Sequence, residues 1–303
     1  MNLEIISNRV RFFFISLLLS NILLWSHSVI AQTDSGGDQN HLALRVASYN
    51  LRMDTPRDSI NAWPNRKEEV SALISYHDFD IVGTQEGFLH QLQDLCEDPA
   101  YTYYGAGRDD GQQAGEHAAI LYKKDRFLVL DSGDFWLREA PDEPGLGWDA
   151  TCCHRICSWV RLQDKTSSKE FYVFNTHFDH QGVIARQESA KLLLAKIQEI
   201  AGDQPVICLG DFNSTPETIQ IQQLSNELKD AFFHSETPVY GPIGTFNGFK
   251  WDAPLRDRID YVFVSDHFQI KKYATLTDSK DQRYPSDHLP VVVDLFLLPL
   301  TIR

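Results

Sequence analysis

The stretch from Pro205 to Asn213, with the sequence PVICLGDFN, constrains the fold more than any other part of the chain. Its first half is a short apolar run that a proline precedes and a glycine ends, which is typical of a strand buried on both faces. Asp211 and Asn213 follow at once, and in an extended chain they point to the same side. They are either the cap and turn of an ordinary strand end, or polar groups that a buried strand holds rigidly at the edge of a core.

Other strand ends help to decide between these interpretations, because the same arrangement recurs along the chain. The predicted strand at 42–50 ends in an asparagine, and acids or histidines stand at the ends of several later predicted strands. These polar residues are Asn50, Glu86, His177, Asp179, Asp211, Asn213, Asp260, Asp287 and His288. Each one alone is well explained as a cap or a solvated residue. Because so many stand beside apolar strands, they indicate one shared site.

Hydrophobic periodicity predicts about ten strands and three or four helices. The helices are expected at 66–77, 88–95, 182–201 and 216–226, and one of the strands at 244–249. Most strands follow one another at hairpin spacing with helices between them, which favours an α/β (α+β) fold of two packed mixed sheets with outer helices. No linker interrupts the pattern, so residues 42–303 are expected to form a single domain.

The first residues differ from the rest. Arg9 and Arg11 precede a short apolar run, and small residues follow at 29–31. This pattern is typical of a secretory signal peptide, which we place at 1–31, with a flexible segment at 32–41. The run is too short to span a bilayer comfortably; an uncleaved anchor is the alternative. We therefore expect an exported protein, periplasmic or extracellular, with no membrane span after cleavage.

The formal net charge of −14 bears on the partners of the protein. A protein that grips nucleic acid non-specifically usually carries the opposite sign, because its affinity comes from neutralising phosphates. The acidic balance disfavours such a function, although a local basic groove would still permit it. It also fits a site that gathers carboxylates around a cation.

The chain has five cysteines, and an odd number leaves at least one unpaired within a monomer. Cys208 lies in the buried strand and is expected to act as a small apolar residue. Cys152, Cys153 and Cys157 lie close together, with Cys96 farther away. The cluster is compatible with a disulfide in an exported protein, or with a zinc site that includes His154, although the spacing is poor for zinc.

The residue types at the strand ends indicate a particular chemistry. Carboxylates and carboxamide oxygens suit a hard cation such as Mg²⁺ or Mn²⁺. No cysteine and few histidines join the set, which argues against a site for a soft metal. The two histidines and the Asp/Asn pair remain to handle protons and a developing negative charge.

The motifs SYN, TQE, NTHFD, GDFN, RIDYVF and SDHLPV, in this order from residue 48 to 291, resemble those of the endonuclease/exonuclease/phosphatase superfamily. The resemblance covers nearly all of the chain after the predicted signal peptide and points to an exported bacterial member. It implies a DNase I-like fold, a four-layer α/β/β/α sandwich. It also implies an enzyme that hydrolyses phosphate esters by metal-assisted in-line attack of water, with one metal ion or two.

The same resemblance implies roles for the strand-end residues. Glu86 is implied as the principal metal ligand, with Asn50 and Asp287 beside it. His288, paired with Asp260, is implied to orient or deprotonate the attacking water. Asp211 would position this water, Asn213 would bind the phosphoryl group, and His177 would donate to a phosphate oxygen or assist the leaving group.

Further residues are particular to this chain and are expected to contact the substrate, unless they form ordinary surface ion pairs. They are Asp179, Arg108, His117 and Arg155. We expect a monomer that acts on a small phosphorylated compound such as a sugar phosphate. The alternatives are a secreted nuclease, a sphingomyelinase-like lipid phosphodiesterase with an apolar hairpin at 241–251, and a catalytically silent binding domain.

Overall fold

The computed structural model describes residues 41–299. The predicted signal peptide at 1–31, and the predicted flexible segment except for His41, lie outside the described residues. The described residues belong to one compact unit that begins at Asn40. In this part of the chain, no helix is long and apolar enough to cross a membrane.

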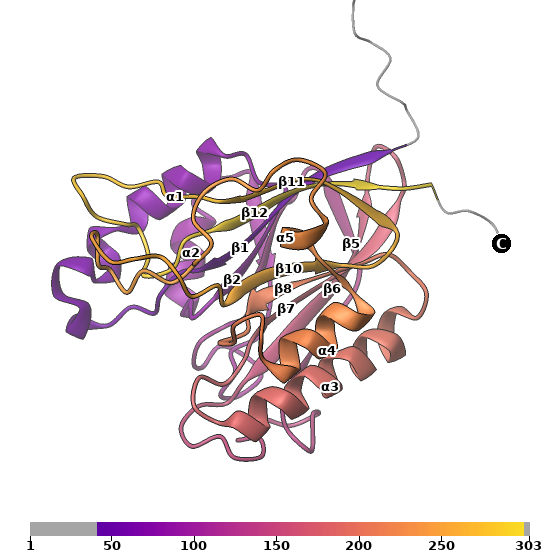
Figure 1. The fold of residues 1–303 in the computed structure, drawn as a ribbon, viewed down its shortest axis with the longest axis horizontal. Coiled ribbons are helices and arrows are strands. Elements are labelled where there is room, and N and C mark those ends of the chain that lie inside the picture. The colour runs from indigo at the N-terminus through magenta and orange to yellow at the C-terminus, as the bar shows by residue number, and fades with distance from the viewer. Residues whose placement is uncertain (1–40, 300–303) are drawn as a thin grey trace, which may run out of the picture. The chain divides into compact units, whose positions relative to one another are not determined.

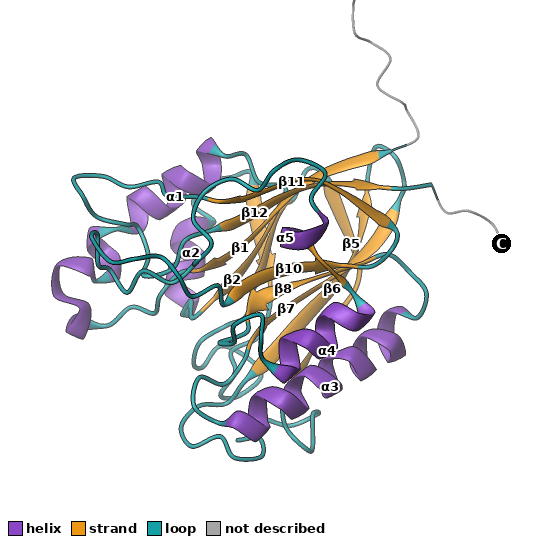
Figure 2. Ribbon diagram, viewed as in Figure 1, coloured by secondary structure: helices purple, strands orange, loops and turns teal. Residues whose placement is uncertain are grey.

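Two six-stranded mixed sheets form the centre of the fold (Figures 1 and 2). The first sheet contains, in spatial order, β11 (Phe268–Thr275), β12 (Val291–Leu297), β1 (Leu42–Asn50), β2 (Ile81–Gln85), β4 (Ile120–Lys123) and β3 (Tyr101–Tyr104). The second contains β5 (Phe127–Trp136), β6 (Ile156–Asp164), β7 (Glu170–His177), β8 (Val206–Asp211), β10 (Asp260–Val264) and β9 (Lys229–Asp230). Within each sheet one central pair is parallel, β1 with β2 and β7 with β8. The carboxyl ends of each pair therefore meet at one edge.

Helices cover the outer face of each sheet, because each helix has an apolar stripe to bury. The helices are α1 (Lys67–Tyr76), α2 (Leu89–Leu95), α3 (Val183–Ala201), α4 (Ile219–Glu227) and α5 (Ala231–His234), with 3-10 turns η1 (Pro56–Asn61) and η2 (Trp63–Asn65). Side chains of α1 and α2 share an apolar cluster with β1 and β2. Those of α3 and α4, adjacent in Figure 2, share another with β7, β8 and β10. The predicted four-layer α/β/β/α sandwich is confirmed.

The space between the sheets is filled by a third apolar cluster, to which β1, β7, β8, β10 and β12 all contribute. The two sheets approach each other closely near the ends of β2 and β8. A Cβ atom on Gly83 would lie only 1.7 Å from Cδ1 of Leu209, so a larger residue at this position of β2 requires the Leu209 side chain to move.

A polar network joins the two sheets beside this close approach. Nδ2 of Asn175, on β7, donates to the backbone carbonyls of Thr84 and Ala119, each at 2.8 Å. Nε2 of Gln85, on β2, donates to Oδ1 of Asn175 at 2.7 Å. Because a buried polar group is costly when unpaired, these bonds specify how the strand ends of the two sheets align.

The segment 244–249 differs from the prediction, since it forms no regular strand. Phe246 makes only an isolated bridge to His288. The backbone N–H groups of Asn247 and Gly248 both donate to the carbonyl oxygen of Asp287, at 2.8 and 3.0 Å. The segment thus contacts the loop that precedes β12, while the backbone N–H groups at 244–246 donate to carbonyls of residues 255 and 257; its hydrogen bonds therefore join loops and not a regular strand.

We expect the substitution Asn175→Ala to lower the free energy of unfolding by about 3 kcal/mol, since buried partners left unpaired cost roughly 1–3 kcal/mol each. Denaturant unfolding monitored by circular dichroism measures the change. The control is Gln163→Ala on neighbouring β6, whose amide bonds only to Glu170 in a partly exposed pair; there we expect a change within about 0.5 kcal/mol. Similar small losses in both variants would contradict a role of the network in stability.

Candidate active site

The two parallel strand pairs bring polar side chains from both sheets to one place. Asn50 ends β1 and Glu86 follows β2, while His177 and Asp211 end β7 and β8. Glu86 and Asn213 have positive φ angles of 62° and 47°. Such left-handed conformations are uncommon for residues other than glycine, although asparagine adopts them more readily than glutamate, and they often occur at functional sites. Here each one lies shortly after the end of a strand.

Asn50 links the two sheets directly. Its Nδ2 donates to Oε1 of Glu86 at 3.1 Å and to Oδ2 of Asp211 at 3.0 Å. Its Oδ1 accepts the backbone N–H of Arg52 at 2.9 Å. In this conformation Asn50 therefore presents its amide nitrogen to the two carboxylates, and its amide would have to turn over before its oxygen could face a cation between them.

A buried acid–histidine pair lies beside Asp211. His288 Nδ1 is 2.9 Å from Oδ2 of Asp260, and His288 Nε2 is 3.7 Å from Oδ2 of Asp211. The hydroxyl of Thr245 donates to the same Asp260 oxygen at 2.5 Å. Sequence reasoning missed Thr245, because only the folded loop brings it to the start of β10.

His177 and Asn213 form the opposite side of Asp211. Asn213 Nδ2 lies 3.0 Å from Nε2 of His177 and donates to the backbone carbonyl of Phe178 at 3.0 Å. The Asn213 backbone N–H donates to Oδ1 of Asp211 at 2.9 Å. His177 Nε2 is 3.5 Å from Oδ2 of Asp211. Asp211 is thus in contact with groups from β1, β7 and the loop before β12.

Arg52 is a further residue that sequence reasoning left without a role. Its guanidinium is 3.7 Å from Oε2 of Glu86 and 3.8 Å from Oδ2 of Asp287, so both carboxylates converge on one small region. It also forms a two-point ion pair with Asp58. Its place two residues after Asn50, just beyond the predicted strand, was the available signal.

The carboxyl groups differ in their electrostatics. Burial, reinforced by the Asp260 charge, raises the pKa of Asp211 to about 7. Burial also raises the pKa of Asp287 to about 6, against the opposing effect of His288. Burial acts in the same direction on Glu86, but His288, the Met53 N–H and Arg52 outweigh it and hold its pKa below the ordinary value.

The two histidines shift in opposite directions. Burial alone would lower the pKa of His288, but Asp260 and Asp211 raise it well above its ordinary value, so the ring is an imidazolium at neutral pH. Burial, together with the positive charges of Arg155 and Arg108, holds the pKa of His177 well below its usual range. His177 is therefore neutral at neutral pH.

These residues surround a pocket of about 330 Å³. The predicted site residues that line it are Glu86, Arg108, Arg155, His177, Asp211, Asn213, Asp287 and His288. Asn50, Asp179 and Asp260 are buried and contact members of this set. His117 is not among the lining residues; it is buried behind the pocket, with Nδ1 3.2 Å from the carbonyl oxygen of Gly87.

The donor set fits a hard divalent cation. Glu86 and Asp287 converge, and burial disfavours the charge of Asp287 until a cation offsets it. Among the described residues, Asp211, Asp260 and His288 also place potential ligand atoms within 4.8 Å of one another. We prefer the Glu86–Asp287 side, because Asp260 and His288 already satisfy each other as an ion pair and an imidazolium does not bind a cation.

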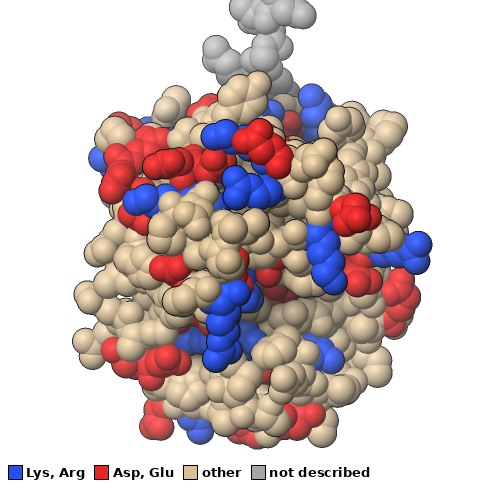
Figure 3. Space-filling model, turned by 90° about the vertical axis from the view of Figure 1, so that its left-hand side faces the viewer, with Lys and Arg blue, Asp and Glu red and all other residues tan. Residues whose placement is uncertain are grey.

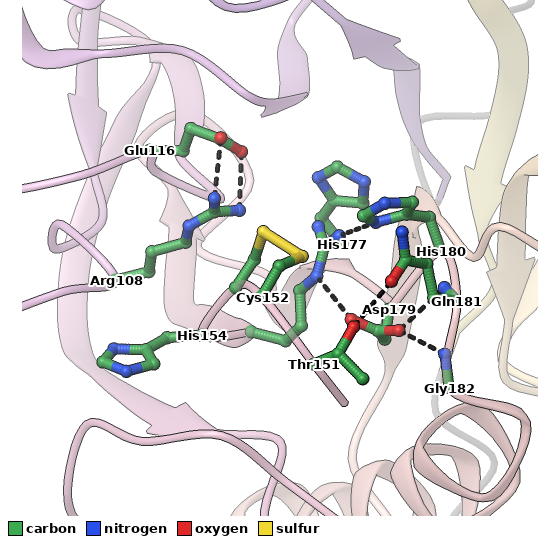
Figure 4. Close-up of a disulfide and its surroundings, with 12 residues drawn as sticks. Arg108, Glu116, Thr151, Cys152, His154, His177, Asp179, His180, Gln181 and Gly182 are labelled. Carbon is green, nitrogen blue, oxygen red and sulfur yellow. Dashed lines mark hydrogen bonds and ion pairs between the residues drawn. A yellow bond between two sulfur atoms is a disulfide. The ribbon is translucent and has the colours of Figure 1, made fainter. Parts of the chain in front are cut away.

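The cysteine cluster contains a disulfide between the neighbouring residues Cys152 and Cys153, while Cys96, Cys157 and Cys208 are free. Among the described residues, the group with cysteine that could hold a metal is Cys152, Asp179 and His180, and it does not include His154. Since Cys152 is bonded to its neighbour, the structure favours the disulfide over a zinc site. Figure 4 shows the disulfide between the Arg108–Glu116 pair and the side chains of His177, Asp179 and His180.

Comparisons with known proteins agree with this geometry. The profile of the "Endonuclease/Exonuclease/phosphatase family" matches residues 47–288. A mannosyl-6-phosphatase structure from Bacteroides thetaiotaomicron VPI-5482 is 44% identical, with a TM-score of 0.80 over 83% of this chain and 99% of the other. A Bacteroides thetaiotaomicron protein of the same family is 44% identical, with a TM-score of 0.81 over 85% and 98%. An uncharacterized Acanthamoeba polyphaga mimivirus protein is 28% identical over 254 residues, 78% of this chain and 92% of its own.

We expect Mg²⁺ to raise the unfolding temperature relative to EDTA, and to do so more at pH 7.5 than at pH 5.5. The pKa values of Asp211 and Asp287 are higher in the folded than in the unfolded protein, so their negative charges destabilise the metal-free fold at pH 7.5. As the pH falls through about 7 for Asp211 and about 6 for Asp287, protonation removes this destabilisation. His288 acts in the same direction, because its raised pKa stabilises the fold most at low pH. At pH 7.5 a bound cation offsets the charge of these carboxylates and so stabilises the fold. At pH 5.5 the cation competes with protons for the same groups and stabilises the fold less.

Differential scanning fluorimetry at both pH values measures these shifts. Glu86→Gln should remove most of the Mg²⁺ effect, whereas Asp266→Asn, which changes an exposed carboxylate at 92% exposure, should leave it unchanged. An equal Mg²⁺ shift in Glu86→Gln and the parent protein would argue against Glu86 as a ligand.

Proposed function

The chain belongs to the endonuclease/exonuclease/phosphatase family, whose members are phosphoester hydrolases, and on that premise we propose that it is an exported, Mg²⁺-dependent phosphatase of a small phosphorylated compound such as a sugar phosphate. The observation that carries the proposal is the position of Asp211. This carboxylate is buried, has a pKa of about 7, and lies among Asn50, His177 and His288 at the floor of the pocket. A base with a pKa near the working pH is efficient in proton transfer.

In the proposed reaction, a water oxygen forms a bond to phosphorus and its proton passes to Asp211. The bond between phosphorus and the ester oxygen breaks; that oxygen keeps the bonding electrons and takes a proton from solvent. The products are an alcohol and inorganic phosphate. A divalent cation held by Glu86 and Asp287 would offset the negative charge on the phosphoryl group. Asn213 would donate to the same group from Nδ2, in place of its present contact with His177.

The charges of the site residues favour catalytic roles that differ in part from those that the resemblance implies. His288 is held as an imidazolium by Asp260, so it cannot accept a proton from water. We assign proton acceptance to Asp211, and to His288 the stabilisation of negative charge on the phosphoryl oxygens. His177 is neutral, and once its contact with Asn213 is released its Nε2 would donate to a phosphoryl oxygen.

Several observations support a small substrate. The relative at 44% identity is described as a mannosyl-6-phosphatase, and a pocket of about 330 Å³ suits a compound of sugar-phosphate size. Figure 3 shows the side of the molecule that lies on the left in Figure 1, toward which β1 runs. On this side acidic side chains are interspersed with basic ones. A nuclease that binds an extended polyanion would instead need a continuous basic track. The disulfide is compatible with export.

A lipid phosphodiester is a second candidate, favoured by one observation. The segment 239–251 exposes several large apolar side chains, among them Tyr240 at 74% and Ile243 at 60%. Phe246 of the same segment lines the pocket, so an apolar surface continues from the pocket rim. Exposed apolar groups beside a catalytic pocket often mark contact with an apolar ligand or a membrane.

The test is phosphate release by residues 32–303 with Mg²⁺ or EDTA. The panel consists of hexose 6-phosphates, inositol phosphates and nucleotides, with sphingomyelin vesicles, plasmid DNA and RNA assayed in parallel. We expect Mg²⁺-dependent release from a sugar phosphate with the nucleic acids left intact. Nicked plasmid or cleaved sphingomyelin, without release from any monoester, would replace the proposal by the corresponding diesterase.

We expect Asp211→Asn to lower kcat on the best substrate by roughly 10²–10⁴, because proton transfer by a positioned base contributes about that factor. His288→Ala should lower it by about 10²–10³, the loss typical of one electrostatic stabiliser. Both variants should remain folded by circular dichroism. Asp266→Asn and His90→Ala, matched changes at exposed positions, should keep full activity. Turnover near that of the parent protein in either site variant would refute the assigned roles.

A further inference from the structure

Arg155, immediately before β6, carries donors that the described protein does not use. Its side chain is 6% exposed, and it lines the pocket together with Glu86 and His177. Nη2 contacts Nδ1 of His180 at 2.8 Å, and Nε is 3.6 Å from Oδ2 of Asp179. Neither Nε nor Nη1 has a hydrogen-bond partner among the described residues. Nε still faces the Asp179 carboxylate, whereas Nη1 shares the end of the guanidinium with Nη2. Because buried polar groups are normally satisfied, the donors at this end call for a ligand.

The surroundings leave Arg155 free to use these donors. His180 faces the guanidinium, and its pKa is lowered by burial and by Arg155, so it is a neutral acceptor and does not compete as an ion pair. Oδ1 of Asp179 accepts the backbone N–H groups of Gln181 and Gly182 at 2.8 and 2.5 Å. Asp179 therefore holds its own loop, and its other oxygen lies beyond hydrogen-bond distance of Arg155.

Arg108 offers a contrast in the same pocket. Its two terminal nitrogens donate to the two carboxylate oxygens of Glu116 at 2.6 and 2.7 Å, a paired arrangement visible in Figure 4. Both terminal nitrogens of Arg108 thus have a partner, whereas in Arg155 Nη2 has one and Nη1 has none among the described residues. Both charges reach the catalytic groups, since Arg155 and Arg108, after burial, are the strongest influences on the lowered pKa of His177.

The segment before Arg155 is stiffened by the bond between Cys152 and Cys153. A disulfide between neighbouring residues closes a small ring and restricts the backbone torsions within it. Cys153 lines the same pocket as Arg155. The ring therefore fixes the backbone at the rim of the pocket, two residues before Arg155.

We infer that Arg155 is the specificity-determining residue that makes this site prefer phosphate monoesters over phosphate diesters, by donating from Nη1 and from the second N–H of Nη2 to the terminal phosphoryl oxygens. A monoester is close to a dianion at neutral pH and presents three terminal oxygens, because its second pKa is near 6. A diester carries one charge and has only two such oxygens. A guanidinium matches two phosphoryl oxygens with two parallel bonds. This inference rests on the proposed function and specifies its substrate class.

The test compares kcat/KM for 4-nitrophenyl phosphate and bis(4-nitrophenyl) phosphate in the parent protein, Arg155→Met and Arg155→Lys, with Mg²⁺ present. Bonds to a charged group contribute about 1.5–3 kcal/mol, so Arg155→Met should lower the value for the monoester by roughly 10- to 100-fold and that for the diester by less than about threefold. Arg155→Lys, which keeps the charge without the fork, should fall between. Arg161→Met, six residues on at a 39% exposed position of β6, should change neither. Equal losses on both substrates would overturn the inference.

A binding measurement separates this inference from the proposed function. Calorimetric titration of inorganic phosphate, with Mg²⁺ present, should give a Kd that is roughly 10- to 100-fold weaker in Arg155→Met than in the parent protein or Arg161→Met. If no ester is hydrolysed but phosphate affinity still depends on Arg155, the proposed function fails while the anion site stands. An unchanged phosphate Kd in a folded Arg155→Met or Arg155→Lys variant would refute the inference, whatever the turnover.

Discussion

The hydrogen bonds from the Asn50 amide to Glu86 and Asp211 are the interaction on which the site depends, because they join the two sheets at their strand ends. Both carboxylates belong to backbones that are anchored in buried strands. A slip of one strand by a single residue would turn its side chains to the opposite face. The packing between the sheets, with Gly83 against Leu209 and Asn175 bonded across to β2, prevents that slip. The geometry of the site is therefore a consequence of how the core packs.

The pocket has two electrostatic sides. On one, Glu86, Asp211 and Asp287 crowd negative charge; burial makes this charge costly for the two aspartates, and a cation would relieve it. On the other, Arg155 and Arg108 supply positive charge. The histidines reflect this division, since His288 is held charged by two aspartates and His177 is held neutral near two arginines. One residue type thus takes two states because its surroundings differ. A phosphoryl group between the two sides would meet positive charge on both once a cation is bound.

Sequence reasoning reached the fold and the strand-end residues because both depend on local pattern. An apolar run that stops at Asp211 predicts where that carboxylate lies, whatever else packs around it. The roles that it left unassigned depend on contacts between distant segments. Thr245 reaches Asp260 through a loop that periodicity describes wrongly as a strand, and the contacts of Arg52 with Glu86 and Asp287 join segments far apart in the sequence. The sequence alone also could not predict which of the two histidines is charged, since the charge depends on neighbours many residues away.

An acidic protein can bind an anionic substrate because net charge and local donors act over different distances. At physiological ionic strength, exposed charges are screened over about 8 Å, so the formal net charge of −14 mainly affects how large polyanions approach the surface. In the proposed function Arg155 would act at contact distance, where its burial makes a charged hydrogen bond stronger. A long nucleic acid must keep many phosphates near the acidic surface, whereas a small monoester would place its one phosphate against the buried donors. On this proposal, the same charge distribution disfavours the polymer and accommodates the small substrate.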